Sequence, residues 1–499
     1  MPNNEFGDFQ TPRELAQRVL RSLPKRSWKR ILEPTCGVGN FLHELASEIE
    51  EAHLIGIEIQ SGYVGEARRT SADIIESDLF SMNAGTDLSW RIEGPMLVVG
   101  NPPWVTNAQL TRLDSNNRPE RVNIKNLAGM DALTGASNFD IAEFIWLKLI
   151  SELRSHRPVI SLLCKTQVAR NVLEHSWRIG LPISSASLRL IDAKKWFAAA
   201  VDACLLTIEV GAEGQGGADQ VCDLYDTLES VDPARRFGMV DGRLVADLDA
   251  YERARYLDGE CPVEWRQGMK HDAASVMELP SDRIVDVEDD YVYPLLKGTD
   301  VFRSKLDPRR RVIVPQRALG EDTRLLERDA PRLWGYLSKN ADVLDGRKSS
   351  IYRNRPRFCI FGIGDYSFAP YKIAVSGLHK SASFRAVGPV AGKPVFFDDT
   401  CYLLPFHDPA EAGIVAALLA TDEAEGFFQS LAFWDAKRPI TKKLLKRIDL
   451  LALAERVDEQ ELALGAQKFV AQLGAAVPDD EVLAVVAELK RRWRVNRRP

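Results

Sequence analysis

The sequence GNPPW (100–104) follows the apolar run 96–99 and contains the residue types with the clearest chemistry. Two consecutive prolines fix two φ angles and donate no backbone N–H, so this turn is stiff and ends the strand. The side-chain oxygen of Asn101 and the carbonyl of Pro102 could accept both N–H bonds of an exocyclic amine and aim its lone pair at a methyl donor. Trp104 would supply a stacking face for the ring that carries this amine. The alternative is a strand-ending loop with one buried aromatic residue.

A glycine-containing turn in ILEPTCGVGNFL (31–42) follows the first expected strand. Gly37 and Gly39 suit a backbone that approaches a ligand, and open α/β sheets bind ligands at the carboxyl ends of their strands. Glu58 closes the next strand, about 20 residues after the glycines, as expected for a partner of ribose hydroxyls. Leu42 stands where a dinucleotide-binding GxGxxG motif has its third glycine. The pattern therefore favours S-adenosylmethionine, a single nucleoside with an amino-acid tail, over NAD.

Asp78 follows the third expected strand, in IIESDLF (74–80). Its carboxylate could accept a hydrogen bond from the exocyclic amine of an adenine. Taken alone, an Asp at this place is more typical of a helix N-cap or a turn. Asp78 is therefore a candidate cofactor contact only together with the neighbouring motifs.

The elements that position these motifs alternate between strand and helix over roughly the first 210 residues, as βαβ units do. We predict an α/β, doubly wound, Rossmann-like sheet of seven strands. Expected strands lie at 30–32, 54–59, 74–76, 95–99, 159–164 and 203–210, and expected helices at 40–50, 61–70, 139–154 and 166–178. The polar stretch 105–137 is long for a connection, which is typical of a functional lid.

A glycine-rich segment divides the chain into expected domains. Residues 1–212 form the predicted catalytic domain, and 213–219 the linker. Residues 220–455 contain short strands, aromatic residues and arginines, and predict a mixed α+β second domain. Residues 456–499 have helical spacing and end in a basic tail, which suits either a contact with a polyanion or a solubilising end.

The composition, 45% hydrophobic and 27% charged over 499 residues, is that of a globular chain of two or three domains. No apolar run approaches eighteen residues and no basic, apolar leader begins the chain, so we expect neither a membrane span nor secretion. Seven scattered cysteines without CxxC or metal-ligand spacing predict reduced thiols, a cytoplasmic location and no metal site.

The net charge of −6 alone argues against a nucleic-acid partner, but the basic residues are unevenly distributed. They cluster at 303–317, 347–357, 437–447 and 490–494, all in the C-terminal half. One such cluster is usually a solvated face, whereas four in one half favour a surface that faces a polyanion.

The order of these motifs resembles that of the gamma class of adenine-N6 DNA methyltransferases of restriction-modification type. FQTP (9–12), LEPTCGVGNFL (32–42), GIEI (56–59), SDLF (77–80) and NPPW (101–104) match its successive motifs. Stretches 138–150, 159–170 and 192–210 resemble later motifs of the catalytic domain. More weakly, 293–301 and 345–385 resemble its C-terminal target recognition domain.

The resemblance implies S-adenosylmethionine as cofactor, duplex DNA as partner, and methylation of the N6 amine of a flipped-out adenine. The implied cofactor contacts are Phe9, Thr11, Pro12, Glu33, Pro34, Cys36, Gly37, Gly39, Phe41, Glu58, Ile59, Asp78, Leu79 and Asn101. The implied catalytic residues are Asn101, Pro102, Pro103 and Trp104, with Trp104 and Phe197 as the two walls of a slot for the base. The candidate DNA contacts are Lys297, Arg347, Lys348 and Arg353.

Three other functions share parts of this pattern. Trp104 in the tetrapeptide is also frequent in N4-cytosine DNA methyltransferases, although Asn101 favours adenine because a Ser usually opens their tetrapeptide. Protein-glutamine N5 methyltransferases use a similar cradle but are much shorter. A modification and specificity subunit of a larger restriction or phage-defence complex, with a separate endonuclease or defence subunit as partner, is the third alternative.

Overall fold

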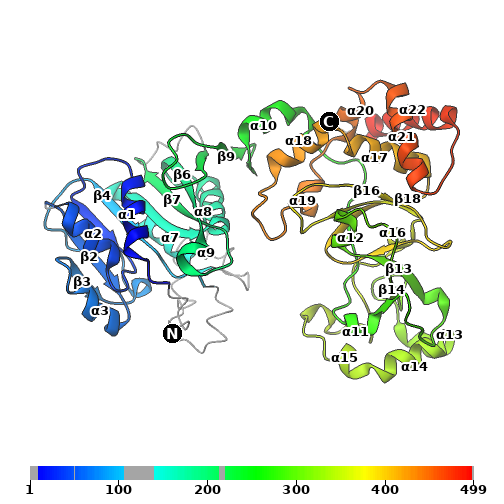
Figure 1. The fold of residues 1–499 in the computed structure, drawn as a ribbon, viewed down its shortest axis with the longest axis horizontal. Coiled ribbons are helices and arrows are strands. Elements are labelled where there is room, and N and C mark those ends of the chain that lie inside the picture. The colour runs from blue at the N-terminus through cyan, green and yellow to red at the C-terminus, as the bar shows by residue number, and fades with distance from the viewer. Residues whose placement is uncertain (1–8, 50, 106–139, 213–219, 497–499) are drawn as a thin grey trace. The chain divides into compact units, whose positions relative to one another are not determined.

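The computed structural model describes residues 9–49, 51–105, 140–212 and 220–496. The chain forms two compact units, Met1–Asp249 and Ala250–Pro499, coloured blue to green and green to red in Figure 1. The expected lid at 105–137, apart from Val105, and the expected linker at 213–219 lie outside the described residues. Among the described helices, none combines the length and apolar character needed to cross a membrane.

The first unit is built on one sheet with the strand order β10-β9-β8-β6-β7-β5-β4-β1-β2-β3. Its strands are β1 Arg30–Glu33, β2 His53–Glu58, β3 Asp73–Glu76, β4 Met96–Gly100, β5 Val159–Lys165, β6 Ile183–Ile191, β7 Ala203–Val210, β8 Val221–Tyr225, β9 Arg235–Val240 and β10 Arg243–Val245. Strands β1 to β5 are parallel to one another, and β7 lies antiparallel between β5 and β6. The carboxyl ends of β1, β2, β3 and β4 therefore meet at one edge.

Two expectations about this sheet need correction. The sheet has ten strands rather than seven, because β8, β9 and β10 follow 213–219 and continue it beyond β6. The compact unit consequently runs to Asp249 and does not end at 212. Strand β6 was missed because its sequence ISSASLRLI mixes serines with apolar residues and only Ile183, Ala186 and Leu188 are buried, so no apolar run marks it.

Along the chain, the helices of this unit alternate with its strands, as the sequence pattern predicts. They are α1 Arg13–Ser22, α2 Asn40–Glu48, α3 Ser61–Ala67, α7 Ile141–Leu153, α8 Thr166–Arg178 and α9 Ala193–Phe197, with 3-10 turns η2 Leu79–Ser81 and η3 Arg154–His156. Helix α7 is buried on nearly all sides, including Glu143 and Lys148. The core joins α1 and α2 to the central strands, with Leu15, Ile31 and Leu97 fully buried.

The second unit contains two four-stranded sheets, β11-β18-β15-β16 and β12-β14-β13-β17. Their strands are β11 Arg266–Gln267, β12 Glu278–Pro280, β13 Val292–Leu296, β14 Arg310–Ile313, β15 Tyr371–Ser376, β16 Arg385–Val387, β17 Phe396–Phe397 and β18 Cys401–Phe406. The mixed α+β character expected for 220–455 is therefore present from Ala250 onward.

Short helices connect these strands, and longer ones close the chain. They are α10 Leu248–Ala254 (which spans the unit boundary), η4 Arg255–Leu257, α11 Ala274–Met277, η5 Asp289–Tyr291, α12 Gly298–Phe302, η6 Thr323–Leu325, α13 Leu326–Asp329, α14 Pro331–Lys339, α15 Ala341–Asp345, η7 Ser350–Tyr352, α16 Asp365–Phe368, α17 Pro409–Leu419, α18 Asp422–Leu431, α19 Lys442–Leu445, α20 Leu450–Ala454, α21 Glu459–Gln472 and α22 Asp479–Asn496. Helices α17, α20, α21 and α22 pack together at one end of this unit (Figure 1). The last two confirm the helical spacing of the C-terminal segment.

Candidate active site

A pocket opens at the edge where the carboxyl ends of the parallel strands meet. Thirteen of the predicted site residues line it: Phe9, Thr11, Glu33, Pro34, Cys36, Gly37, Phe41, Glu58, Ile59, Asp78, Leu79, Asn101 and Pro103. Eleven others that the sequence motifs did not single out also line it: Gln10, Thr35, Asn40, Ile57, Gln60, Tyr63, Ser77, Phe80, Val105, Ile141 and Ile145. Most of these are sequence neighbours of predicted residues, whereas Tyr63, Ile141 and Ile145 come from the expected helices α3 and α7, and only the fold shows that they reach the pocket. The lining does not include Pro12, Gly39, Pro102, Trp104 and Phe197.

The turn after β1 places backbone N–H groups at the pocket. Gly37 and Gly39 have φ of +53° and +81°, a left-handed conformation that favours glycine. The Gly37 N–H donates to Glu58 Oε2 at 2.8 Å, and the Gln60 N–H donates to Glu58 Oε1 at 2.8 Å. A Cβ on Gly37 would lie 2.5 Å from Gln10 Oε1, so a side chain there would displace the Gln10 amide in addition to straining the backbone. Glu58 is thus held at the end of β2 by two backbone N–H groups of the pocket lining.

Glu33, at the end of β1, is a buried carboxyl with an unpartnered oxygen. Its side chain is buried, and Oε2 has no hydrogen-bond partner among the described residues. Burial raises the pKa of Glu33 well above its usual range, and the negative charge of Glu58 adds to the increase. A backbone hydrogen bond from Leu42 lowers the pKa but does not outweigh the burial. A buried carboxyl of this kind gains most from a positively charged ligand group, which would restore its ionised form.

Asp78 begins the turn η2 after β3. Its Oδ1 accepts a hydrogen bond from the Phe80 N–H at 2.9 Å, so it is an N-cap, as the residue type alone suggests. The same carboxyl also lines the pocket. The two interpretations of Asp78 are therefore compatible, because one oxygen caps the turn and the carboxylate retains further acceptor capacity.

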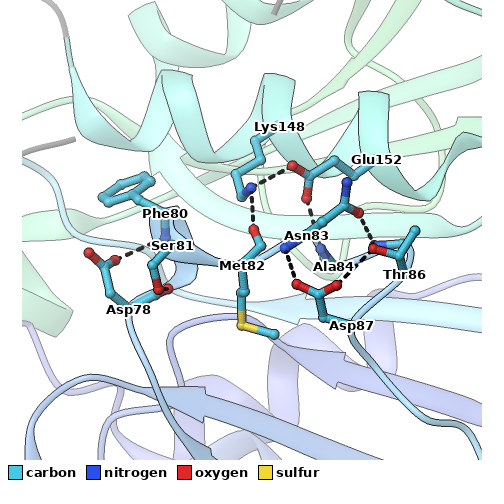
Figure 2. A network of polar contacts seen from close by, with 11 residues as sticks. Asp78, Phe80, Ser81, Met82, Asn83, Ala84, Thr86, Asp87, Lys148 and Glu152 are labelled. Atoms are coloured by element: carbon cyan, nitrogen blue, oxygen red, sulfur yellow. Dashed lines mark hydrogen bonds and ion pairs between the residues drawn. The ribbon is translucent and has the colours of Figure 1, made fainter. Parts of the chain in front are cut away.

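A buried polar network fixes the loop that follows Asp78 (Figure 2). Lys148 of α7 donates to the Met82 carbonyl at 2.6 Å and pairs with Glu152 at 2.5 Å. Glu152 accepts a hydrogen bond from the Ala84 N–H at 2.8 Å. Since both charged side chains are about 90% buried or more, at 7% and 11% exposure, this network anchors the Asp78 loop to α7.

Asn101 directly follows β4, lines the pocket and uses one amide atom in a hydrogen bond to a backbone carbonyl. Its Nδ2 donates to the carbonyl of Phe9 at 2.9 Å. Its Oδ1 is buried and has no partner among the described residues. Asn101 is therefore a pocket residue that carries a desolvated acceptor, and its role toward a substrate amine stays a prediction.

Trp104 and Phe197 come together, as predicted, but they do not enclose an open slot. Their rings meet edge to face, with centroids 5.1 Å apart and planes at 73°. The Phe9 ring lies 5.8 Å from Trp104 and 5.7 Å from Phe197, and the Trp104 Nε1 donates to the Leu163 carbonyl at 3.3 Å. A base can lie between two aromatic rings only if they are nearly parallel, so in this conformation a ring would have to move to admit it.

The predicted DNA contacts lie in the second unit and differ in their surroundings. Lys297 pairs with the buried Glu278 at 2.7 Å. Arg347 donates to three backbone carbonyls and lies 3.8 Å from the Tyr352 ring centroid, so its guanidinium serves the fold of this unit. Lys348 and Arg353 are exposed.

Comparison with known proteins assigns the family. No protein-family model matches the chain. The chain is 39% identical over 472 residues to the type II methyltransferase M.NspV of Nostoc sp., covering 90% of this chain and 97% of that protein. The chain belongs to the type II methyltransferases. A second type II methyltransferase, M.CvrRI of Paramecium bursaria Chlorella virus XZ-6E, is 32% identical over 104 residues, which are 21% of this chain and 26% of that protein.

A solved structure extends the likeness in fold to nearly the whole length of this type II methyltransferase. The type IIL restriction-modification enzyme MmeI, solved in complex with DNA, aligns with 98% of this chain and 76% of its own, with a TM-score of 0.54 and 11% identity. At this identity the likeness is one of fold.

Membership makes this chain a methyltransferase of restriction-modification type and implies an S-adenosylmethionine methyl donor. The pocket fits such a donor in its chemistry. A buried, unpartnered carboxyl oxygen on Glu33 suits a cationic ligand, and the glycine turn brings backbone to the same pocket. Burial, with the charges of Glu33 and Glu58, raises the pKa of the Cys36 thiol, which favours its neutral and less reactive form.

Proposed function

We propose that this chain is a site-specific DNA methyltransferase that transfers a methyl group from S-adenosylmethionine to the N6 amine of an adenine extruded from duplex DNA. The observation that carries the proposal is the buried, unpartnered Oδ1 of Asn101 at the wall of the pocket. Such an acceptor costs free energy unless a donor meets it, and an exocyclic amine is a donor of the right kind.

The cofactor would be held by residues already lining the pocket. Glu33 would face its positive charge, Glu58 would accept from its ribose hydroxyls, and Asp78 would accept from its adenine amine. The bound cofactor supplies an electrophilic methyl group on a sulfonium centre. The residues that fix these three carboxyls, through the Gly37 turn and the α7 network, would hold the cofactor in one orientation.

At the target base, Asn101 Oδ1 and the Pro102 carbonyl would accept the two N–H bonds of the amine. These hydrogen bonds favour a more tetrahedral nitrogen whose lone pair points at the methyl group, and they strengthen as positive charge develops on that nitrogen. Transfer would form the N–C bond as the S–C bond breaks, and the methylated amine would then release one proton to water. Because the acceptors are part of a stiff Pro–Pro turn, little reorganisation is needed during the reaction.

The second unit would bind the duplex through phosphate contacts. Many of its arginines are neutralised by carboxylates, including Arg324, Arg328, Arg332 and Arg357. Around α12 the pattern differs: Arg303, Lys305 and Lys380 are exposed, and none has an ion pair among the described residues. We name these three residues the α12 cation cluster.

Two aromatic rings hold this cluster together. Phe302 and His379 stack with centroids 4.1 Å apart and planes at 9°, which places Arg303 and Lys380 on adjoining segments. The pKa of His379 is lowered by burial and by the charge of Arg303. Uncompensated cations beside one another suit a polyanion, and we propose that DNA phosphates meet them.

The proposal is tested by methyl transfer from tritiated cofactor to unmethylated DNA, followed by nucleoside analysis. We expect N6-methyladenine as the product, and loss of transfer in Asn101→Ala but not in the exposed control Gln429→Ala. Recovery of N4-methylcytosine would replace adenine by the alternative target. Absence of any methylated nucleoside, or full activity of Asn101→Ala, would overturn the proposal.

A further inference from the structure

The amide of Asn101 can fit its site in two orientations that differ by exchange of Oδ1 and Nδ2. In the orientation present, Nδ2 donates to the Phe9 carbonyl at 2.9 Å and Oδ1 is the unpartnered atom. The exchanged orientation would bring the amide oxygen against the carbonyl oxygen of Phe9, and two acceptors repel each other. It would also present N–H donors to the pocket, where they would oppose the N–H groups of an incoming amine.

The Phe9 carbonyl is itself held in place by the residues that follow it. Gln10 Oε1 accepts from the Val38 N–H at 3.1 Å, and the Thr11 carbonyl accepts from Asn40 Nδ2 at 2.8 Å. Both contacts tie the N-terminal segment 9–12 to the turn and helix after β1. The position of the carbonyl is thereby set by the fold rather than by a ligand.

The segment is also anchored on either side of these bonds. On one side, the Phe9 ring packs against both Trp104 and Phe197. On the other side, Arg13 and Gln17 of α1 donate to the buried Glu44 of α2 at 2.5 and 2.7 Å. A carbonyl between two such anchors has little freedom to turn away from Asn101.

We propose that the backbone carbonyl of Phe9 is a positioning group for methyl transfer, which selects the orientation of the Asn101 amide that accepts from the substrate amine. The inference rests on the proposed function, because it assumes that Asn101 Oδ1 receives an amine N–H. It assigns to segment 9–12 a role in the chemical step, beyond its place in the lining of the cofactor pocket.

The test uses Asn101→Asp, which keeps an acceptor toward the pocket but removes the donor toward Phe9. When ionised, the introduced carboxyl has no proton to offer the Phe9 carbonyl and places an anionic oxygen against it. When protonated, it can donate to that carbonyl and leave its other oxygen for the amine. The quantity to measure is the single-turnover methylation rate of this variant divided by that of the wild type. Above the pKa of the introduced carboxyl, this ratio should fall about tenfold per pH unit.

Asn101→Ala is the matched control, because it has no ionisable group at this position and its rate ratio should not depend on pH. The pKa of the introduced carboxyl, followed by carbon NMR in full-length protein labelled at aspartate, should lie above the ordinary value of about 3.9. Adding Phe9→Ala, which removes one anchor of the segment, should bring that pKa down and flatten the rate profile. The NMR measurement decides the matter even if the variant is too slow to assay.

The outcomes separate the inference from the proposed function. A wild-type protein that makes no N6-methyladenine removes the proposed function and this inference with it. A wild-type protein that methylates adenine, with an Asn101→Asp rate ratio that is flat or rises with pH, overturns the inference alone. A normal pKa for the introduced carboxyl, unaffected by Phe9→Ala, overturns it as well.

Discussion

Replacing Lys148 tests whether the buried network in Figure 2 fixes the Asp78 loop. In Lys148→Met the apolar part of the side chain is kept, but the Met82 carbonyl and Glu152 lose their cationic donor. The side chains of Lys148 and Glu152 are only 7% and 11% exposed. Removing one partner of a buried ion pair leaves an uncompensated charge, which typically costs about 3–5 kcal/mol.

For a unit of this size, each kcal/mol corresponds to about 2–4 °C in the unfolding midpoint. We therefore expect the transition of the first unit to fall by roughly 6–20 °C in differential scanning calorimetry. The double variant Lys148→Met/Glu152→Gln, which removes the stranded charge, should recover part of this loss. Cofactor affinity, measured by calorimetric titration below the transition, should weaken because Asp78 loses its support.

The control for this prediction is Lys194→Met, a change of the same kind at an exposed position of α9. We expect that variant to unfold within about 0.5 kcal/mol of the wild type. If Lys148→Met shifted the transition no more than Lys194→Met does, or if it were destabilised with unchanged cofactor affinity, the argument that α7 positions Asp78 would be refuted.

Three further predictions concern the turn, the second unit and DNA. Gly37→Ala places a Cβ 2.5 Å from Gln10 Oε1 at φ +53°, so we expect at least a tenfold loss of cofactor affinity in calorimetric titration, whereas Gly62→Ala, with open space around it, should bind normally. Burial raises the pKa of Glu278, but hydrogen bonds from His271 and Lys297 outweigh it and lower the pKa to about 2. Because the folded-state pKa lies below the unfolded value of about 4.3, this carboxylate stabilises the fold above about pH 4.3, and the stabilisation is lost as the pH falls toward 2. The difference in unfolding midpoint between wild type and Glu278→Gln should therefore shrink over that pH range. A difference that does not depend on pH would contradict the prediction. Replacing the residues of the α12 cation cluster by glutamines should weaken binding to all duplexes alike. The slope of log K against log salt concentration should fall by about 0.9 for each DNA phosphate that the protein no longer neutralises. A slope that is unchanged, and equal to that of the exposed control Lys339→Gln, would exclude the cluster from the DNA interface.

Much of the site was predictable because its residues follow one local pattern along the chain. Glu33, Gly37, Glu58, Asp78 and Asn101 each end a strand or follow it directly, and parallel strands bring their carboxyl ends to one edge. Local sequence patterns therefore determine which residues share the pocket. Tyr63, in contrast, reaches the pocket from α3, and its spacing gives no sign of a role beyond packing, whereas Ile145 falls within 138–150, which resembles a motif of the catalytic domain.

The geometry of the aromatic residues was not predictable in the same way. The sequence predicts that Trp104 and Phe197 lie together, but it does not show whether their rings stack in parallel or meet edge to face. A third ring, that of Phe9, packs against both of them and is far from both in the sequence. The surroundings of Arg347 are a similar case. A basic cluster in the sequence does not reveal that backbone carbonyls already occupy its guanidinium.

The continuation of the catalytic sheet by β8, β9 and β10 bears on how the two units could be recombined between relatives. A fragment ending at residue 212 would leave β6, which spans Ile183–Ile191, without its parallel neighbour β8. An uncovered edge strand offers unpaired N–H and C=O groups to other chains and promotes aggregation. Exchange of the second unit between relatives would therefore need its junction after Val245, where β10 ends and the sheet is complete.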